Sequence, residues 1–206
     1  MKITGQIPEK LKSDLVRICA EVFFPQFDQA TRDALTKLRY SDNAYPIFQK
    51  AGLVYDSPSA QKVRLFSETA SHFANSFDWW LGGLDEDALA AFPAQELTLI
   101  IREAKDARAF PKRWALVGGK VFGKKMIALK WDSIWSKISA FDLPFPPFQL
   151  DSGYEVRDID YREAKSLKLP IPLGLTTTLN LNVNLEDFRK RLIQEIDRVE
   201  LAKAQI

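Results

Sequence analysis

Apolar residues recur at helical spacing over most of the first hundred residues of this chain. A first helix is predicted ahead of Pro25, because four apolar residues fall on one face of it, namely Leu11, Leu15, Ile18 and Val22. A second helix is predicted from about Gln26 to Arg39, and a short apolar helix follows and ends near Gly52.

A longer helix is predicted to begin at Ser57 and to lie deep in the core. Its apolar residues follow a sustained 3-4-3-4 repeat, and they are Val63, Phe66, Ala70, Phe73 and Phe77. After Gly82-Gly83, the acidic run Asp85 to Asp87 predicts the N-terminus of a short helix. Pro93 is interpreted as the start of another helix, whose apolar residues are Leu97, Ile100, Ile101 and Ala104.

The pattern changes at Arg113, where short strands joined by glycine turns are predicted. These strands are Trp114 to Val117, Lys120 to Phe122 and Lys125 to Leu129. A helical turn from Asp132 to Ser139 and an irregular stretch from Phe141 to Gly153 follow.

The last part of the chain is predicted to hold two capped helices. Asp160 and Glu163 have the spacing of a capping box for a helix from Tyr161 to Leu167. Partial alternation indicates a strand within Thr176 to Val183, and Asn184 caps a final helix with an apolar side of Leu185, Phe188, Leu192, Ile196 and Val199.

Together these elements predict an α+β fold that is predominantly helical. N-terminal helices (1–110) pack with a ribbon, loop and short helix (111–169) and with a linker, strand and C-terminal helix (170–206). We expect one compact domain, because 206 residues with 46% hydrophobic and 27% charged residues are typical of a globular chain.

Cysteine content and the absence of apolar runs bear on where the chain resides. Cys19 is the only cysteine, which is typical of a reducing compartment, and on an apolar helix it is most simply a small buried hydrophobe. The N-terminus has no signal-peptide core, and no apolar run approaches the roughly 20 residues of a membrane span. We expect a cytoplasmic protein, or one within an assembled particle, with no membrane partner.

No catalytic, cofactor or metal constellation is predicted. One His and one Cys exclude a Cys/His zinc set, and His72 is interpreted as a half-exposed residue beside the apolar stripe. Gly118-Gly119-Lys120 lacks the flanking residues of a phosphate-binding loop. An enzyme with an acidic site remains an alternative, and its residues would be Asp151, Glu155, Asp158 and Asp160.

The net charge is only +2, but positive charge is concentrated in the predicted ribbon. This suggests a nucleic-acid-binding surface as a second alternative, with contacts from Lys112, Arg113, Lys120, Lys124, Lys125 and Lys130. The competing interpretation is a solvated ribbon whose lysines discourage edge pairing and whose aromatic residues face the core.

The block from Trp131 to Gly153 is rich in aromatic residues and proline. Prolines exclude a central strand, yet the aromatic residues need burial, which favours an ordered loop laid across the core. The alternative is a docking segment for a protein partner or for a second copy of the chain, made by Trp131, Trp135, Phe145, Pro146, Pro147 and Phe148.

Several short motifs follow one another in the second half of the chain: Gly119-Lys120-Val121-Phe122, then Trp135, then Pro146-Pro147-Phe148, then a short strand at Val156 to Asp160 and the helix Arg162 to Leu169. In this order, residues 113–169 resemble the C-terminal part of phage minor head (head morphogenesis) proteins of the Mu type. The family's Cys-x-Cys pair is absent, since residues such as Gly153 to Glu155 stand there. The resemblance implies a structural head-assembly component that acts through protein–protein contacts and not as an enzyme.

Overall fold

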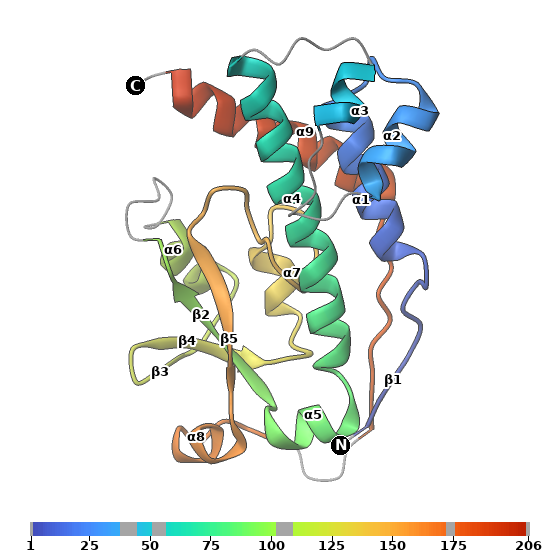
Figure 1. The fold of residues 1–206 in the computed structure, drawn as a ribbon. Helices are drawn as coiled ribbons and strands as arrows, with labels where there is room; N and C mark the ends of the chain where they lie inside the picture. The colour runs from blue at the N-terminus through green and yellow to red at the C-terminus, as the bar shows by residue number, and fades with distance from the viewer. Residues whose placement is uncertain (1, 38–44, 51–56, 102–108, 172–175, 205–206) are drawn as a thin grey trace.

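The computed structural model describes residues 2–37, 45–50, 57–101, 109–171 and 176–204, and Figure 1 shows their arrangement. The helices are α1 (Leu11–Phe23), α2 (Gln29–Thr36), α3 (Tyr45–Lys50), α4 (Ser57–Gly82), α5 (Glu86–Ala91), α6 (Ala109–Leu116), α7 (Ile134–Ile138), α8 (Tyr161–Ser166) and α9 (Leu185–Ala204). The strands are β1 (Lys2–Thr4), β2 (Ala94–Leu99), β3 (Val121–Phe122), β4 (Lys125–Leu129), β5 (Tyr154–Ile159) and β6 (Thr176–Thr178).

The long helix α4 runs through the middle of the molecule, between the sheet and the other long helices (Figure 1). Its apolar face meets α1, where the rings of Phe66 and Phe23 lie 5.8 Å apart, edge to face. It also meets α9, where Phe73 and Phe188 lie 5.2 Å apart. These contacts form a helical core that hides the apolar side of each helix from water.

An antiparallel sheet of four strands has the order β3-β4-β2-β5. The central strand β2 pairs on both sides, so Glu96 lies opposite Ile127 in β4 and Arg157 in β5. Gly123 and Lys124, with φ of 54° and 72°, form the turn between β3 and β4, as a tight hairpin requires. Separately, β1 and β6 pair in parallel, which places the N-terminal segment beside a strand near the C-terminal end.

Both faces of this sheet are covered. On one face α6 and α7 pack through the rings of Trp114 and Trp135, which lie 5.5 Å apart. The indole N–H of Trp114 donates to the carbonyl of Lys120, and that of Trp135 donates to Leu129, so each ring is also anchored at its polar end. On the other face, Ala164 of α8 is fully buried in a small apolar cluster with the sheet.

The block from Trp131 to Gly153 lies between the helices and the sheet. Phe145 reaches the helical core, 5.6 Å from the ring of Phe77 and 5.4 Å from that of Trp80. Phe148 reaches the sheet core instead, where it stacks on Trp135 at 5.7 Å. One loop therefore contributes to both cores and joins them.

The burial of this block settles how its aromatic residues are used. Five of the six residues of the docking interpretation are buried, namely Trp135, Phe145, Pro146, Pro147 and Phe148, and Trp131 is half-buried. Side chains packed in this way cannot at the same time be offered to a partner. The loop across the core is the interpretation that this burial favours.

The α+β, mostly helical fold class is confirmed. The predicted face of α1 is buried at Leu11, Leu15 and Ile18, and the whole predicted stripe of α4 is buried. Caps are confirmed for three helices, since the side chains of Asp85, Asp160 and Asn184 accept hydrogen bonds from the first-turn amides. Cys19 is fully buried, and burial raises the pKa of its thiol. The predicted positions Arg39, Gly52 and Ala104 lie outside the described residues.

Two element predictions are wrong. The helix expected after Pro93 is strand β2, because hydrogen bonds to strands on both sides outweigh the helical spacing of its apolar residues. The strand expected from Trp114 to Val117 belongs largely to α6, where Phe110 and Trp114 lie one turn apart and are both buried. Region 1–110 is consequently not helical throughout, and its strand β2 is the centre of a sheet shared with region 111–169.

Leu143 and Leu116 provide a matched test of how much the block contributes to stability. Leu143 is fully buried in the block, whereas Leu116 is 87% exposed at the end of α6. We expect Leu143→Ala to lower the free energy of unfolding by about 2–5 kcal/mol, because it leaves a cavity where the two cores join. Leu116→Ala should change it by less than about 0.5 kcal/mol in the same urea titration. Equal effects would contradict the central position of the block.

Candidate functional site

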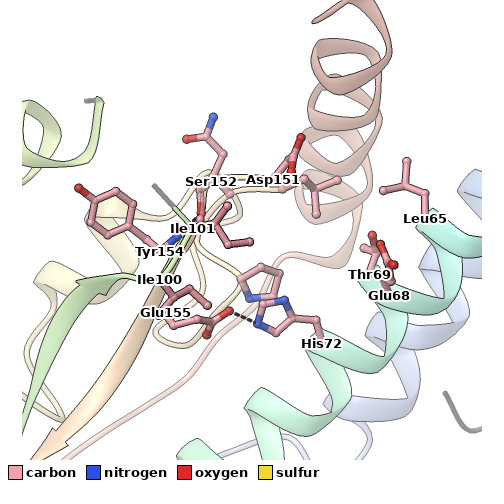
Figure 2. A pocket seen from close by; sticks show the side chains of 14 residues that line it. Leu65, Glu68, Thr69, His72, Ile100, Ile101, Asp151, Ser152, Tyr154 and Glu155 are labelled. Carbon is pink, nitrogen blue, oxygen red and sulfur yellow. Dashed lines mark hydrogen bonds and ion pairs between the residues drawn. The ribbon is translucent and has the colours of Figure 1, made fainter. Parts of the chain in front are cut away.

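A pocket of about 270 Å³ opens where α4, the end of β2 and the start of β5 come together. Figure 2 shows its side chains: Glu68, Thr69 and His72 come from α4, and Ile100 and Ile101 follow β2. The opposite wall is the segment 147–155, which runs from the end of the block Trp131 to Gly153 (the aromatic block) into the start of β5. We call this the acidic pocket, because Glu68, Asp151 and Glu155 line it.

The best-defined contact in the acidic pocket joins its two walls. His72 Nε2 of α4 lies 3.0 Å from Glu155 Oε1 of β5, as the dashed line in Figure 2 marks. Each side chain is about one-third exposed, so the pair lies at the surface of the pocket and not beneath it. Glu155 therefore holds the imidazole ring of His72 in one orientation, since a polar contact at one ring nitrogen restricts rotation of the ring.

Three further polar side chains of the pocket, Glu68, Ser152 and Gln149, are held by neighbours. Glu68 Oε1 accepts a hydrogen bond of 2.7 Å from Arg64, one turn earlier on α4. The hydroxyl of Ser152 accepts from the backbone amide of Tyr154, and it is buried. Gln149 is also buried, and its side-chain oxygen accepts from Arg113 at 3.0 Å. Asp151 is exposed at the mouth of the pocket.

The acidic pocket also has apolar walls. Ile100 and Ile101 are 60% and 51% exposed at its rim, and Leu65 and Pro147 line it as well. Burial raises the pKa of the Tyr154 phenol, so this hydroxyl stays protonated. The pocket thus combines negative charge with exposed apolar surface.

This arrangement bears on what chemistry the pocket can perform. An imidazole held by a carboxylate is the orienting half of a general acid–base system, but a catalytic triad also needs a nucleophile hydrogen-bonded to the imidazole. One hydroxyl of the pocket, that of Ser152, accepts from the amide of Tyr154. Within the described ranges, no three His, Cys, Asp or Glu side chains are arranged to hold a metal ion.

The acidic residues of the enzyme alternative are only partly brought together. Asp151 and Glu155 line the acidic pocket, as that alternative requires. Asp158 is instead paired with Lys130 at 2.9 Å, and Asp160 caps α8 by accepting from the amide of Glu163. Successive residues of a strand point to opposite sides, and a cap serves the helix end, so the four carboxylates do not form one site.

Half of the residues of the predicted basic surface are used inside the protein. Lys130 is only 2% exposed, with its ammonium against Asp158 and 5.7 Å from the ring of Trp79. Lys125 forms an ion pair with Glu163, and Arg113 donates to the carbonyl of Ile138 as well as to Gln149. The exposed residues that remain for a nucleic acid are Lys112, Lys120 and Lys124.

A second charge cluster lies on the face of the sheet that α8 covers. Arg157 contacts Glu96 at 2.6 Å and Glu163 at 3.1 Å, and Lys125 contacts Glu163 at 2.7 Å. Hydrogen bonds from Arg157, and next from Lys125, hold the pKa of Glu163 below its usual value. The same contacts raise the pKa of Arg157. The cluster balances its own charge and ties α8 to the sheet.

Sequence reasoning missed two members of the acidic pocket, Glu68 and His72. The helical pattern placed His72 beside the buried stripe of α4, but nothing local indicated that β5 would lie opposite. Glu155 and Asp151 were identified because they belong to an acidic run. A pairing between distant segments leaves no periodic signal in a single sequence.

None of the described helices has the length and apolar character needed to cross a membrane.

Substitutions at Lys130 and Lys120 compare a buried, paired lysine with an exposed one. Lys130→Met leaves Asp158 without its cation in a largely enclosed position, so we expect the free energy of unfolding to fall by about 2–3 kcal/mol. Lys120→Met, at an exposed position, should change it by less than about 0.5 kcal/mol. Chemical denaturation measures both, and a neutral Lys130→Met would show that the buried pair is dispensable.

Glu163 predicts an acid-dependent loss of stability. Its pKa is lowered in the folded state, so its contribution is complete above the usual glutamate pKa of about 4.3 and disappears as the pH falls through the lower folded-state value. Glu163→Gln should be about 1 kcal/mol less stable than the wild type at pH 7, and the difference should shrink toward pH 3. Glu200→Gln, at an exposed position of α9, serves as the control in the same urea titrations. A difference that persists at pH 3 would contradict this assignment.

Known proteins provide no relative from which a function could be transferred to this chain. No protein-family model matches it. No curated protein and no solved structure matches it either. A function has to be proposed from its own residues and their arrangement.

Proposed function

We propose that this chain is a structural protein of phage or prophage origin that takes part in head assembly through protein–protein contacts. The observation that carries the proposal is the order of segments between Gly119 and Leu169. That order resembles the C-terminal part of Mu-type minor head proteins, and the same segments fold consecutively around one sheet, as β3 and β4, α7, the aromatic block, β5 and α8.

Further support comes from what the resembling residues do. A Cβ at Gly119 would lie 2.3 Å from Trp114 Nε1, so only glycine lets the chain pass this ring. Phe148 stacks on Trp135, and Ala164 is fully buried beneath the sheet. These positions shape turns and core packing. A pattern made of such positions describes a shared folding unit and not a set of catalytic groups.

The surface near the ribbon offers apolar contacts to a protein partner. Leu116 and Val121 are 87% and 58% exposed on either side of the turn at Gly118-Gly119. Exposed apolar residues of this size favour a protein–protein contact when they lie close together. They replace the aromatic block as the candidate docking residues, because its side chains are buried.

The proposal predicts portal and capsid genes beside the gene for this chain, and the experiment is co-expression with the products of those genes. We expect the chain to copurify with the portal or with assembled heads in a fixed ratio. The double variant Leu116→Asp and Val121→Asp should reduce incorporation at least tenfold, since a charge buried in an apolar contact is costly. Leu201→Asp places the same charge at a residue that is 65% exposed on α9, and it should not reduce incorporation.

Two results would overturn the proposal. One is a gene that lies far from any phage structural gene. The other is a chain that folds normally but is absent from particles purified from the co-expressing cells. Circular dichroism of each variant separates loss of contact from loss of fold.

A further inference from the structure

We propose that copies of this chain associate head to tail, through a contact between the face around α5 of one copy and the face around the ribbon of β3 and β4 of the next. This inference rests on the proposed function, because it names a second copy of the chain as the partner that the exposed residues beside the ribbon contact. Both faces belong to the described part of the chain, and their chemistry is complementary.

The first face lies at the end of α4 and along α5. We call it the α5 face, and its exposed residues are Trp79, Glu86, Asp87 and Phe92. Trp79 and Phe92 are each 41% exposed, and the ammonium of Lys130 lies 5.7 Å from one ring and 5.9 Å from the other, so the rings share one surface. A helix of six residues is only about 9 Å long, so the acids of its first turn lie within the area of a protein–protein contact.

The second face surrounds the turn between α6 and the ribbon. We call it the ribbon face, and its exposed residues are Leu116, Lys120, Val121 and Lys124. The amide of Gly118 donates to the carbonyl of Ala115 at 3.1 Å, which turns the chain back directly after α6. Val121 pairs with Met126 across the hairpin that has Lys124 in its turn. These short connections keep the apolar residues and the lysines close together.

Charge complementarity is the argument for a second copy as the partner. The ribbon face carries two lysines and no carboxylate, whereas the α5 face carries two carboxylates and no cation. The ion pairs among the described residues involve none of Lys120, Lys124 and Asp87, so these charges are available to a neighbour. Each face also has exposed apolar side chains, and apolar contacts among opposite charges are the usual composition of an interface.

The positions of the two faces favour a head-to-tail contact over a symmetric dimer. In Figure 1, α5 lies at the bottom of the molecule, whereas the ribbon of β3 and β4 projects from its left side. One copy therefore does not cover its own ribbon face with its own α5 face. A contact between unlike faces leaves one face of each kind unused in every pair, so association continues into a ring or a filament.

The test measures the mass of the full chain by analytical ultracentrifugation over a range of concentrations. We expect the average mass to rise past that of a dimer at about 50 mM salt and to fall toward that of a monomer at about 500 mM, because the contact depends on exposed charges. In NMR spectra of the 15N-labelled chain, the amide signals of residues 86–92 and 116–124 should shift with concentration. Those of residues 186–200 on α9 should not.

A charge exchange tests whether these two faces meet each other. The double variant Lys120→Glu and Lys124→Glu should weaken association about tenfold or more, because like charges then face each other. Adding Glu86→Lys and Asp87→Lys to the same chain should restore association to within about threefold of the wild type, because the charges are opposite again.

The matched control places the same two lysines elsewhere. Adding Asp197→Lys and Glu200→Lys to the double variant restores the same net charge at exposed residues of α9, and it should not restore association. Circular dichroism of each variant reports whether its helices are retained. If the exchanged chain does not fold, the concentration-dependent NMR shifts of the wild type decide between the faces.

The results also separate this inference from the proposed function. A monomer at every concentration up to about 1 mM, association that stops at a dimer, or equal restoration by the control would overturn the inference. If the chain enters phage heads but stays monomeric alone, only this inference fails, and the ribbon face contacts a different head protein. If the chain associates head to tail but does not enter heads, the head-assembly function fails.

Discussion

The need to bury the aromatic residues of one proline-rich loop holds the two halves of this protein together. Phe145 of that loop lies against Phe77 and Trp80 in the helical core, and Phe148 stacks on Trp135 in the sheet core. Neither core is complete without the loop, because its rings close the apolar surface of both. Prolines restrict the unfolded chain at this segment, so less entropy is lost when the loop takes its place.

The acidic pocket is a consequence of this arrangement. The loop leads directly into β5, which brings Asp151 at the end of the loop and Glu155 of β5 to the wall of the pocket opposite α4. His72 then meets Glu155 across the boundary between the helices and the sheet. Arg113 fixes the same region from the other side through Gln149 and the carbonyl of Ile138. A pocket at such a boundary combines groups from several elements, each held in place by the packing behind it.

The charged side chains of this protein have two kinds of surroundings. Lys130, Lys125 and Arg157 face carboxylates inside or beside the sheet, so they stabilise the fold and contribute little positive field to the surface. The carboxylates of the acidic pocket are only partly balanced, by the exposed Arg64 that pairs with Glu68. A molecule with a small net charge can therefore still present a locally negative surface.

Local patterns were sufficient for α1, α4, α8 and α9, because helical periodicity and capping depend on residues close together in the sequence. The cluster of acidic residues in the sequence identified Asp151 and Glu155 as candidate site residues. Only the tertiary structure decided that β2 is a central strand, that Lys130 is buried and that His72 and Glu155 form one site. Each of these depends on which distant segments pack together. Hydrogen bonding on both sides of β2, and the burial of the aromatic loop, outweigh local preference there.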